Sequence, residues 1–166
     1  MRSKLLLMVA LVALAAMAAA QTKTSGTASF TKPEPMYSIE VGDHAGHSLY
    51  INKAACTWTK GMEIAGLETK DGHDVTYGDV KGNKAHVNGY HISNMSNGDK
   101  IYVRFQGTDT MKDGKMETSE GTWSYIGGTG KLKGIKGKGT YKGKPDAAGN
   151  MVYAIEGEYE LPAAKK

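Results

Sequence analysis

Apolar and polar residues alternate along most of the chain from Met36 onward, which is typical of β-strands that bury one face. The final run shows this most clearly. One side carries Met151, Tyr153, Ile155, Tyr159 and Leu161, and the other carries Val152, Ala154, Glu156, Glu158 and Glu160. After residue 20, helical spacing is not sustained over the roughly 11 residues that an amphipathic helix needs. The pattern therefore predicts strands and no long helix.

Turn signals divide this pattern into about eight short runs, among them the hairpin signal Asn97-Gly98 and the turn Asp113-Gly114. We predict an all-β fold with a single closed antiparallel β-barrel of about eight strands over residues 36–162. A two-sheet sandwich is the alternative. The barrel is favoured because closure removes exposed sheet edges, and because glycines mark bends on the predicted inner face.

Residues 120–144 predict a hairpin around Gly127-Gly128-Thr129-Gly130. Its second strand places Lys136, Lys138, Thr140, Lys142 and Lys144 on one face and Ile135, Gly137, Gly139, Tyr141 and Gly143 on the other. We expect the lysines to face solvent, with the glutamates of the last strand as neighbours across the pairing. An inward face rich in glycine leaves room inside the barrel.

The first twenty residues have the form of a secretory signal peptide. Arg2 and Lys4 precede an apolar run over 5–17, and three alanines precede the expected cleavage point between Ala20 and Gln21. The run is shorter than the roughly 20 residues of a membrane-spanning helix. We expect a periplasmic or secreted protein with a flexible leader over 21–35, the barrel over 36–162 and a disordered tail over 163–166.

Charge and cysteine content limit the function classes. The chain has 21 Lys and Arg against 17 Asp and Glu, and without Arg2 and Lys4 the excess falls to 19 against 17. So small an excess does not favour a nucleic-acid partner, and we expect no membrane span. The single cysteine, Cys56, is either a reactive thiol or a small buried side chain beside Trp58, and we favour the second interpretation.

The run GGTGKLKGIKG over residues 127–137 resembles the glycine signature of the allene oxide cyclase-like barrels. That superfamily includes the plant dirigent proteins and many uncharacterised exported bacterial proteins. The resemblance implies an eight-stranded antiparallel barrel whose lumen can hold a hydrophobic small molecule. In characterised relatives the barrel steers cyclisation or coupling of a reactive intermediate. The motif itself is structural, so no catalytic residue is transferred through it.

Arg104 is the only arginine after residue 20, and a single arginine can serve as a fixed planar donor to a carboxylate. Tyr102 and Gln106 share its face of the predicted strand over 101–108. If that face lines the lumen, three polar groups converge there. The alternative is that Val103 and Phe105 face inward and Arg104 pairs with a surface acid, which is the default for a barrel.

Asp43, His44 and His47 lie in one predicted loop at a spacing that can serve a metal ion. Two histidines and a carboxylate in a glycine-containing loop are also common by chance. His86 and His91 are five residues apart on a strand, so they point to opposite faces. We assign no metal ligand and expect no cofactor.

The function we predict is binding of a small hydrophobic molecule in the lumen, with a role that the sequence leaves unassigned. The candidate ligand-binding residues are Tyr90, Tyr102, Arg104, Phe105, Trp123, Tyr141 and Tyr153. One alternative is an isomerase or cyclase of lipid-derived or phenolic substrates, with Arg104, Tyr102 or Asn88 holding the polar end. Another is a structural or interaction domain whose barrel is filled by its own side chains. Whether the protein is an enzyme, and whether it forms a homo-oligomer, stay open.

Overall fold

The computed structural model describes residues 21–163, and its regular elements there are strands and one short 3-10 helix. The strands are β1 (Thr22–Phe30), β2 (Met36–Glu40), β3 (His47–Lys60), β4 (Glu63–Ile64), β5 (Leu67–Lys81), β6 (Lys84–Met95), β7 (Lys100–Lys112), β8 (Lys115–Gly128), β9 (Lys136–Pro145) and β10 (Met151–Glu160). The 3-10 helix η2 covers Gly130–Leu132. The predicted all-β fold is confirmed.

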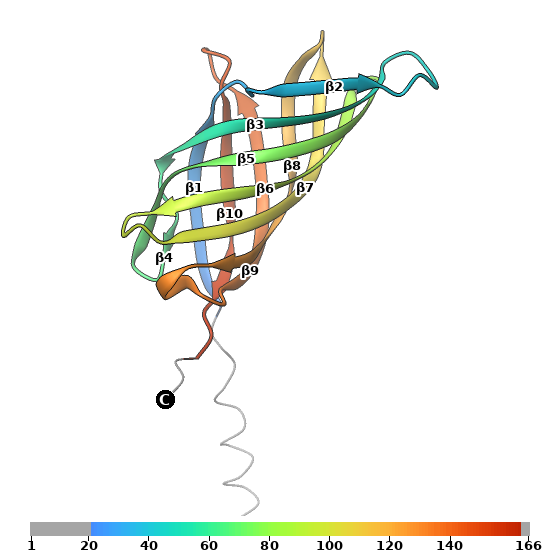
Figure 1. Cartoon of the computed structure of the whole chain (residues 1–166). Coiled ribbons are helices and arrows are strands. Elements are labelled where there is room, and N and C mark those ends of the chain that lie inside the picture. The colour runs from blue at the N-terminus through green and yellow to red at the C-terminus, as the bar shows by residue number, and fades with distance from the viewer. Residues whose placement is uncertain (1–20, 164–166) are drawn as a thin grey trace, which may run out of the picture.

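Eight of these strands close into an antiparallel barrel, as the sequence predicts (Figure 1). Around the ring they follow the order β1, β10, β9, β8, β7, β6, β5 and β3. The long strand β3 closes the ring because its first part pairs with β5 and its last residues pair with β1. The short strands β2 and β4 are added outside the ring, on β3 and β5 respectively.

The outer face of β9 and β10 carries the predicted charges. Lys136 lies opposite Glu160 and Lys138 lies opposite Glu158 in the antiparallel register. Opposite charges at such cross-strand positions stabilise a sheet surface. The register thus gives these two lysines a glutamate of the last strand as neighbour, whereas Lys142 and Lys144 lie opposite Ala154 and Val152.

The inner face of the same strands carries glycines, and aromatic rings of the protein lie against them. A Cβ added at Gly157 would come within 2.5 Å of the Trp123 ring, and one at Gly143 within 2.4 Å of the Tyr153 ring. Real Cβ atoms do not approach other atoms so closely. Glycine is required at these positions because the rings lie against the backbone there, so much of the room that the glycines leave is occupied by the protein itself.

One end of the barrel is closed by apolar side chains. Met62, Ile64 and Leu67 come from the segment around β4, and Leu132 and Ile135 from the segment around η2, and all five are buried. The β4 segment is fixed to the barrel by hydrogen bonds from the Ala65 N–H to Tyr159 Oη (2.9 Å) and from Thr24 Oγ1 to the Glu63 carbonyl (2.9 Å). Figure 1 shows β4 at this end and β2 at the opposite end.

The structure corrects the expected domain boundaries at one place. Residues 22–30, predicted to be a flexible leader, form strand β1 between β10 and β3. Its Ala28 and Phe30 are buried, whereas its remaining residues are mostly Thr, Ser and Gly and carry no apolar alternation. The predicted signal peptide over 1–20 and most of the predicted tail lie outside the described residues. Within residues 21–163, no helix is long and apolar enough to cross a membrane.

Candidate functional site in the barrel lumen

The lumen contains a cavity of about 600 Å³. Its wall extends from Met62 and Ile101 near the closed end to Met36 and Ser38 of β2 at the other end. Inward-facing residues of all eight barrel strands contribute to the lining. A volume in this range and a mainly apolar lining are typical of small-molecule sites.

Four of the predicted binding residues line this cavity: Phe105, Trp123, Tyr141 and Tyr153. The Phe105 and Tyr141 rings meet edge to face with centroids 6.2 Å apart, and the Tyr141 and Tyr153 rings with centroids 5.8 Å apart. Such contacts hold aromatic rings in fixed orientations. The structure therefore places these four predicted residues in the wall of the cavity.

The other three predicted residues lie on the outer surface. Tyr90 is half exposed, and Tyr102 and Arg104 alternate with the buried Ile101 and Val103 on β7. Because neighbouring side chains on a strand point to opposite faces, burial of these two aliphatic residues directs Tyr102 and Arg104 outward. None of the three lines the lumen cavity, so the interpretation in which Arg104 and Tyr102 converge inside the barrel is wrong. Arg104 borders an open polar depression of the outer wall instead.

A row of hydrogen-bonded polar groups faces the cavity between β5, β6 and β3. His91 Nδ1 lies 2.5 Å from Asp74 Oδ1, and His91 Nε2 lies 2.7 Å from Ser93 Oγ. The Trp58 indole N–H donates to the same Ser93 oxygen at 3.0 Å. An ionised carboxylate only accepts, so Nδ1 carries the proton and Nε2 accepts from the serine hydroxyl. This hydrogen-bond order is that of a Ser-His-Asp arrangement.

Burial decides which member of this row a ligand can reach. Ser93 has no exposed surface, and its oxygen is already bonded to Trp58 and His91. The side chain of Asp74 is 19% exposed, which is more than that of His91. All three residues line the cavity, and Asp74 is the most exposed of them, held in place by its hydrogen bond with His91. The geometry favours proton transfer at Asp74 over nucleophilic attack by Ser93.

A second carboxyl group, Asp109 of β7, lies inside the barrel. Burial raises its pKa above the ordinary value, and hydrogen bonds with Ser119 and Tyr50 oppose this shift. The Tyr50 hydroxyl donates to Asp109 Oδ2 at 3.5 Å, a long contact. A carboxyl whose pKa is raised is closer to being protonated at neutral pH and can then donate to a ligand.

Tyrosine hydroxyls supply further polar groups in the lumen. Burial is the main cause that raises the pKa of Tyr50, Tyr125, Tyr141 and Tyr153, so all four stay protonated at neutral pH. The Tyr125 hydroxyl is buried and has no hydrogen-bond partner among residues 21–163. A buried hydroxyl without a partner costs free energy. Its oxygen has almost no accessible surface, so a molecule in the cavity does not touch it in this arrangement of side chains.

Cys56 is buried beside Phe30 and Ala54, in a small apolar cluster at the β1–β3 contact. Burial also raises the pKa of its thiol, with Asp74 and Asp71 adding to the effect. A thiol with a raised pKa is protonated and unreactive at neutral pH. The favoured interpretation of Cys56 as a small buried side chain is confirmed.

Sequence reasoning missed Asp74, His91, Ser93 and Asp109 because charged and polar residues on strands are expected to face solvent. One signal was present. His91 shares its face of β6 with Ala85 and Val87, two apolar residues that the strand buries. The predicted opposite orientation of His86 and His91 is confirmed, because His86 is exposed and His91 is buried. The partner Asp74 lies on another strand and had no local signal.

No protein-family model and no curated protein matches this chain. Among solved structures, it is similar to a protein of unknown function of the DUF3224 family from Shewanella oneidensis MR-1. That match has 21% identity, covers 87% of this chain and 100% of the other, and has a TM-score of 0.49. A pyocyanin demethylase matches with 15% identity over 80% of this chain and 98% of the other, with a TM-score of 0.43.

A pterocarpan synthase dirigent protein matches with 13% identity over 88% of this chain and 89% of the other, with a TM-score of 0.51. At so low a sequence identity, the match shows a similarity of fold alone. The likeness to the dirigent protein confirms the barrel fold that the glycine motif of residues 127–137 implied.

Proposed function

We propose that this protein is exported and that its barrel holds a small, largely apolar molecule carrying at least one polar group. Export rests on the pattern of residues 1–20. Binding rests on one observation above all: a cavity of about 600 Å³ into which a carboxylate, a second buried carboxyl and tyrosine hydroxyls project from an apolar wall. A few fixed polar groups in an apolar pocket orient a ligand.

The cavity also counts against the alternative of a purely structural domain. A barrel that serves only as a scaffold can be packed by its own side chains at the density of other protein interiors. Here the closed end is packed in this way, but the rest of the lumen is not. The unpartnered Tyr125 hydroxyl is a further cost that a scaffold has no reason to retain.

Native mass spectrometry of the untagged protein, purified from the cells that make it, tests this proposal. We expect a population that carries additional mass, which is released on unfolding. Val87 faces the cavity, so Val87→Phe fills part of it and lowers the bound fraction. Val75 faces outward on the neighbouring strand, and Val75→Phe is the matched control that leaves binding unchanged. Equal retention by wild type and Val87→Phe contradicts binding in the lumen.

A second candidate function is acid–base catalysis of isomerisation or cyclisation in the same cavity. The observation that favours it is the Asp74–His91–Ser93 row, in which a histidine holds a cavity-facing carboxylate. Such a carboxylate can remove a proton from a bound substrate. A barrel of this fold belongs to a synthase in the case of the pterocarpan synthase dirigent protein. None of the three residues proposed from sequence for this role, Arg104, Tyr102 and Asn88, lines the lumen cavity, whereas Asp74 does.

Turnover of lipid-derived epoxides or phenolic intermediates tests the catalytic candidate. General acid–base catalysis contributes about 10²–10⁴-fold, so we expect Asp74→Asn to reduce turnover by that factor. Asp113 lies in an exposed turn, and Asp113→Asn is the control for loss of a carboxylate. Absence of turnover, or an unchanged rate in Asp74→Asn, excludes this candidate and leaves binding untouched.

A further inference from the structure

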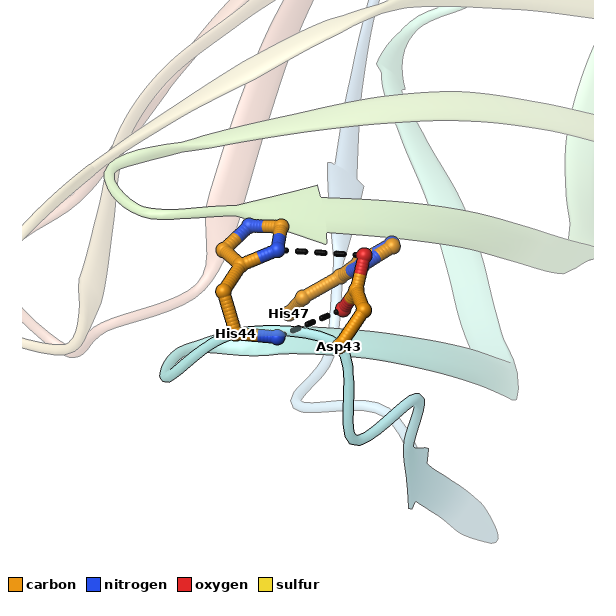
Figure 2. Close-up of side chains that lie close together, drawn as sticks. All are labelled: Asp43, His44 and His47. Atoms are coloured by element: carbon orange, nitrogen blue, oxygen red, sulfur yellow. Dashed lines mark hydrogen bonds and ion pairs between the residues drawn. The ribbon is translucent and has the colours of Figure 1, made fainter.

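The loop between β2 and β3 gathers two histidines and a carboxylate at the end of the barrel opposite β4. Figure 2 shows Asp43, His44 and His47 converging there. Gly42 and Gly46 have positive φ angles of 84° and 75°, which glycine adopts readily, so the chain can turn sharply at both ends of the loop. One potential donor atom from each of the three polar side chains lies within 4.8 Å of the other two.

The distances between these atoms resemble those of a shared coordination site. His44 Nδ1 lies 3.1 Å from Asp43 Oδ2, and His47 Nδ1 lies 2.6 Å from Asp43 Oδ1. Ligands at about 2.0–2.1 Å from a tetrahedral Zn²⁺ ion are about 3.4 Å apart. Because Asp43 and His44 are about half exposed, their side chains can separate by the remaining fraction of an ångström.

A fourth residue, Asp79 of β5, fixes the orientation of the buried ligand. His47 Nε2 lies 3.0 Å from Asp79 Oδ1, and Lys81 Nζ holds the other oxygen of that carboxylate at 3.2 Å. Without a metal ion, His47 Nδ1–H donates to Asp43 Oδ1 at 2.6 Å. When a metal ion replaces this proton, Nε2–H still donates to Asp79 and the Nδ1 lone pair is directed toward the ion beside Asp43. A carboxylate behind a ligating histidine is the usual way in which proteins orient such a ring.

We propose that Asp43, His44 and His47 bind a divalent transition metal ion, with Asp79 as a positioning residue. Two imidazoles and one carboxylate suit Zn²⁺, Cu²⁺ or Ni²⁺ and do not suit Mg²⁺ or Ca²⁺, which prefer oxygen ligands. Three protein ligands leave a coordination position open to water or another ligand. The site lies on the outer face of β3 and β5 and is separate from the lumen.

Calorimetric titration of Zn²⁺ into untagged, chelator-treated protein tests the site. We expect one saturable site per chain and no binding of Mg²⁺ in the same buffer. Zn²⁺ that binds only the folded state also raises Tm. His44→Ala and Asp43→Asn alter exposed side chains, so both variants are expected to fold, and each removes one ligand. Either change should weaken Zn²⁺ binding at least about tenfold.

Asp79→Asn tests the positioning role, and we expect it to weaken binding by about 10–100-fold without removing a ligand. His86 lies opposite Asp79 in the register of β5 and β6, so it is unsuitable as a control. His73, which pairs with Ala55 and Ile92, is distant along the strands, and His73→Ala should leave binding unchanged. No saturable binding, or binding that Asp43→Asn and His44→Ala leave unchanged, overturns the site. Unchanged binding in Asp79→Asn overturns the role of Asp79.

Discussion

At the β4 end of the barrel, inward side chains are apolar and pack closely around Ile64 and Leu132, neither of which is exposed. Farther along the lumen, the same strands turn Asp74, His91 and Asp109 inward around an open cavity. The backbone pairing is continuous through both regions. The difference therefore lies in the side chains: the closed end contributes hydrophobic stability, whereas the cavity region keeps buried polar groups that stability alone does not require.

The largest effect is expected at the closed end. Ile64→Ala leaves a cavity among well-packed side chains, which costs about 2–5 kcal/mol of the free energy of unfolding. Ile51 lies on the outer face and is about half exposed, so Ile51→Ala is the matched control, with an expected change of about 0.5 kcal/mol or less. Chemical denaturation monitored by tryptophan fluorescence measures both. Similar losses in the two variants contradict the assignment of the core to this end.

The glycines beside Trp123 give the next largest effect. A Cβ at Gly139 would lie 2.6 Å from the Trp123 ring and 2.0 Å from the Glu156 carbonyl oxygen. We expect Gly139→Ala to destabilise the protein by about 1–3 kcal/mol, because either the ring or the backbone must shift. Thr140→Ala at the adjacent outward position is the control. Denaturation midpoints that are equal in the two variants show that the ring moves freely.

The sequence predicts the aromatic wall of the lumen but not its row of polar groups. The aromatic wall at Trp123, Tyr141 and Tyr153 follows from alternation and glycine placement, which are local properties of a strand. The row Asp74–His91–Ser93 joins two strands, so it depends on a register that one sequence does not specify. Strand β1 was missed because it is rich in Thr, Ser and Gly, and its place is set by pairing with β10 and β3.

The loop between β2 and β3 shows the same difference between signals that are local in the sequence and contacts that depend on strand pairing. Asp43, His44 and His47 lie close together in the sequence, so the sequence alone indicates their grouping. The approach of Asp79 from β5, which distinguishes an oriented histidine from a chance grouping, depends instead on the pairing of β3 with β5. Local motifs are therefore predictable from the chain, whereas contacts between distant strands are not.

Asp109 allows a pH test of the polar region. Burial raises its pKa in the folded state, so its contribution to stability is complete below the ordinary value of 3.8 and is lost as the pH rises through the folded-state value. At pH 7 the raised pKa of this carboxyl lowers the free energy of unfolding, and an amide at the same position avoids that cost. We expect Asp109→Asn to raise Tm by about 3 °C at pH 7, and the gain to vanish near pH 3. Asp113→Asn in an exposed turn is the control. If Asp109→Asn instead lowers Tm at pH 7, the Asp109 carboxylate is stabilised by contacts stronger than those with Tyr50 and Ser119.

The smallest effect is expected at Arg104, the residue whose position the sequence left open. Its side chain is exposed, and among the described residues it has no ion-pair partner within 4.0 Å. Arg104→Ala should therefore change the free energy of unfolding by about 0.5 kcal/mol or less. Ligand retention in native mass spectrometry should equal that of the wild type, whereas Val87→Phe, which fills part of the lumen, should reduce it. Loss of retention in Arg104→Ala together with full retention in Val87→Phe would move the binding site from the lumen to the outer wall. The polar groups inside the barrel would then need another explanation.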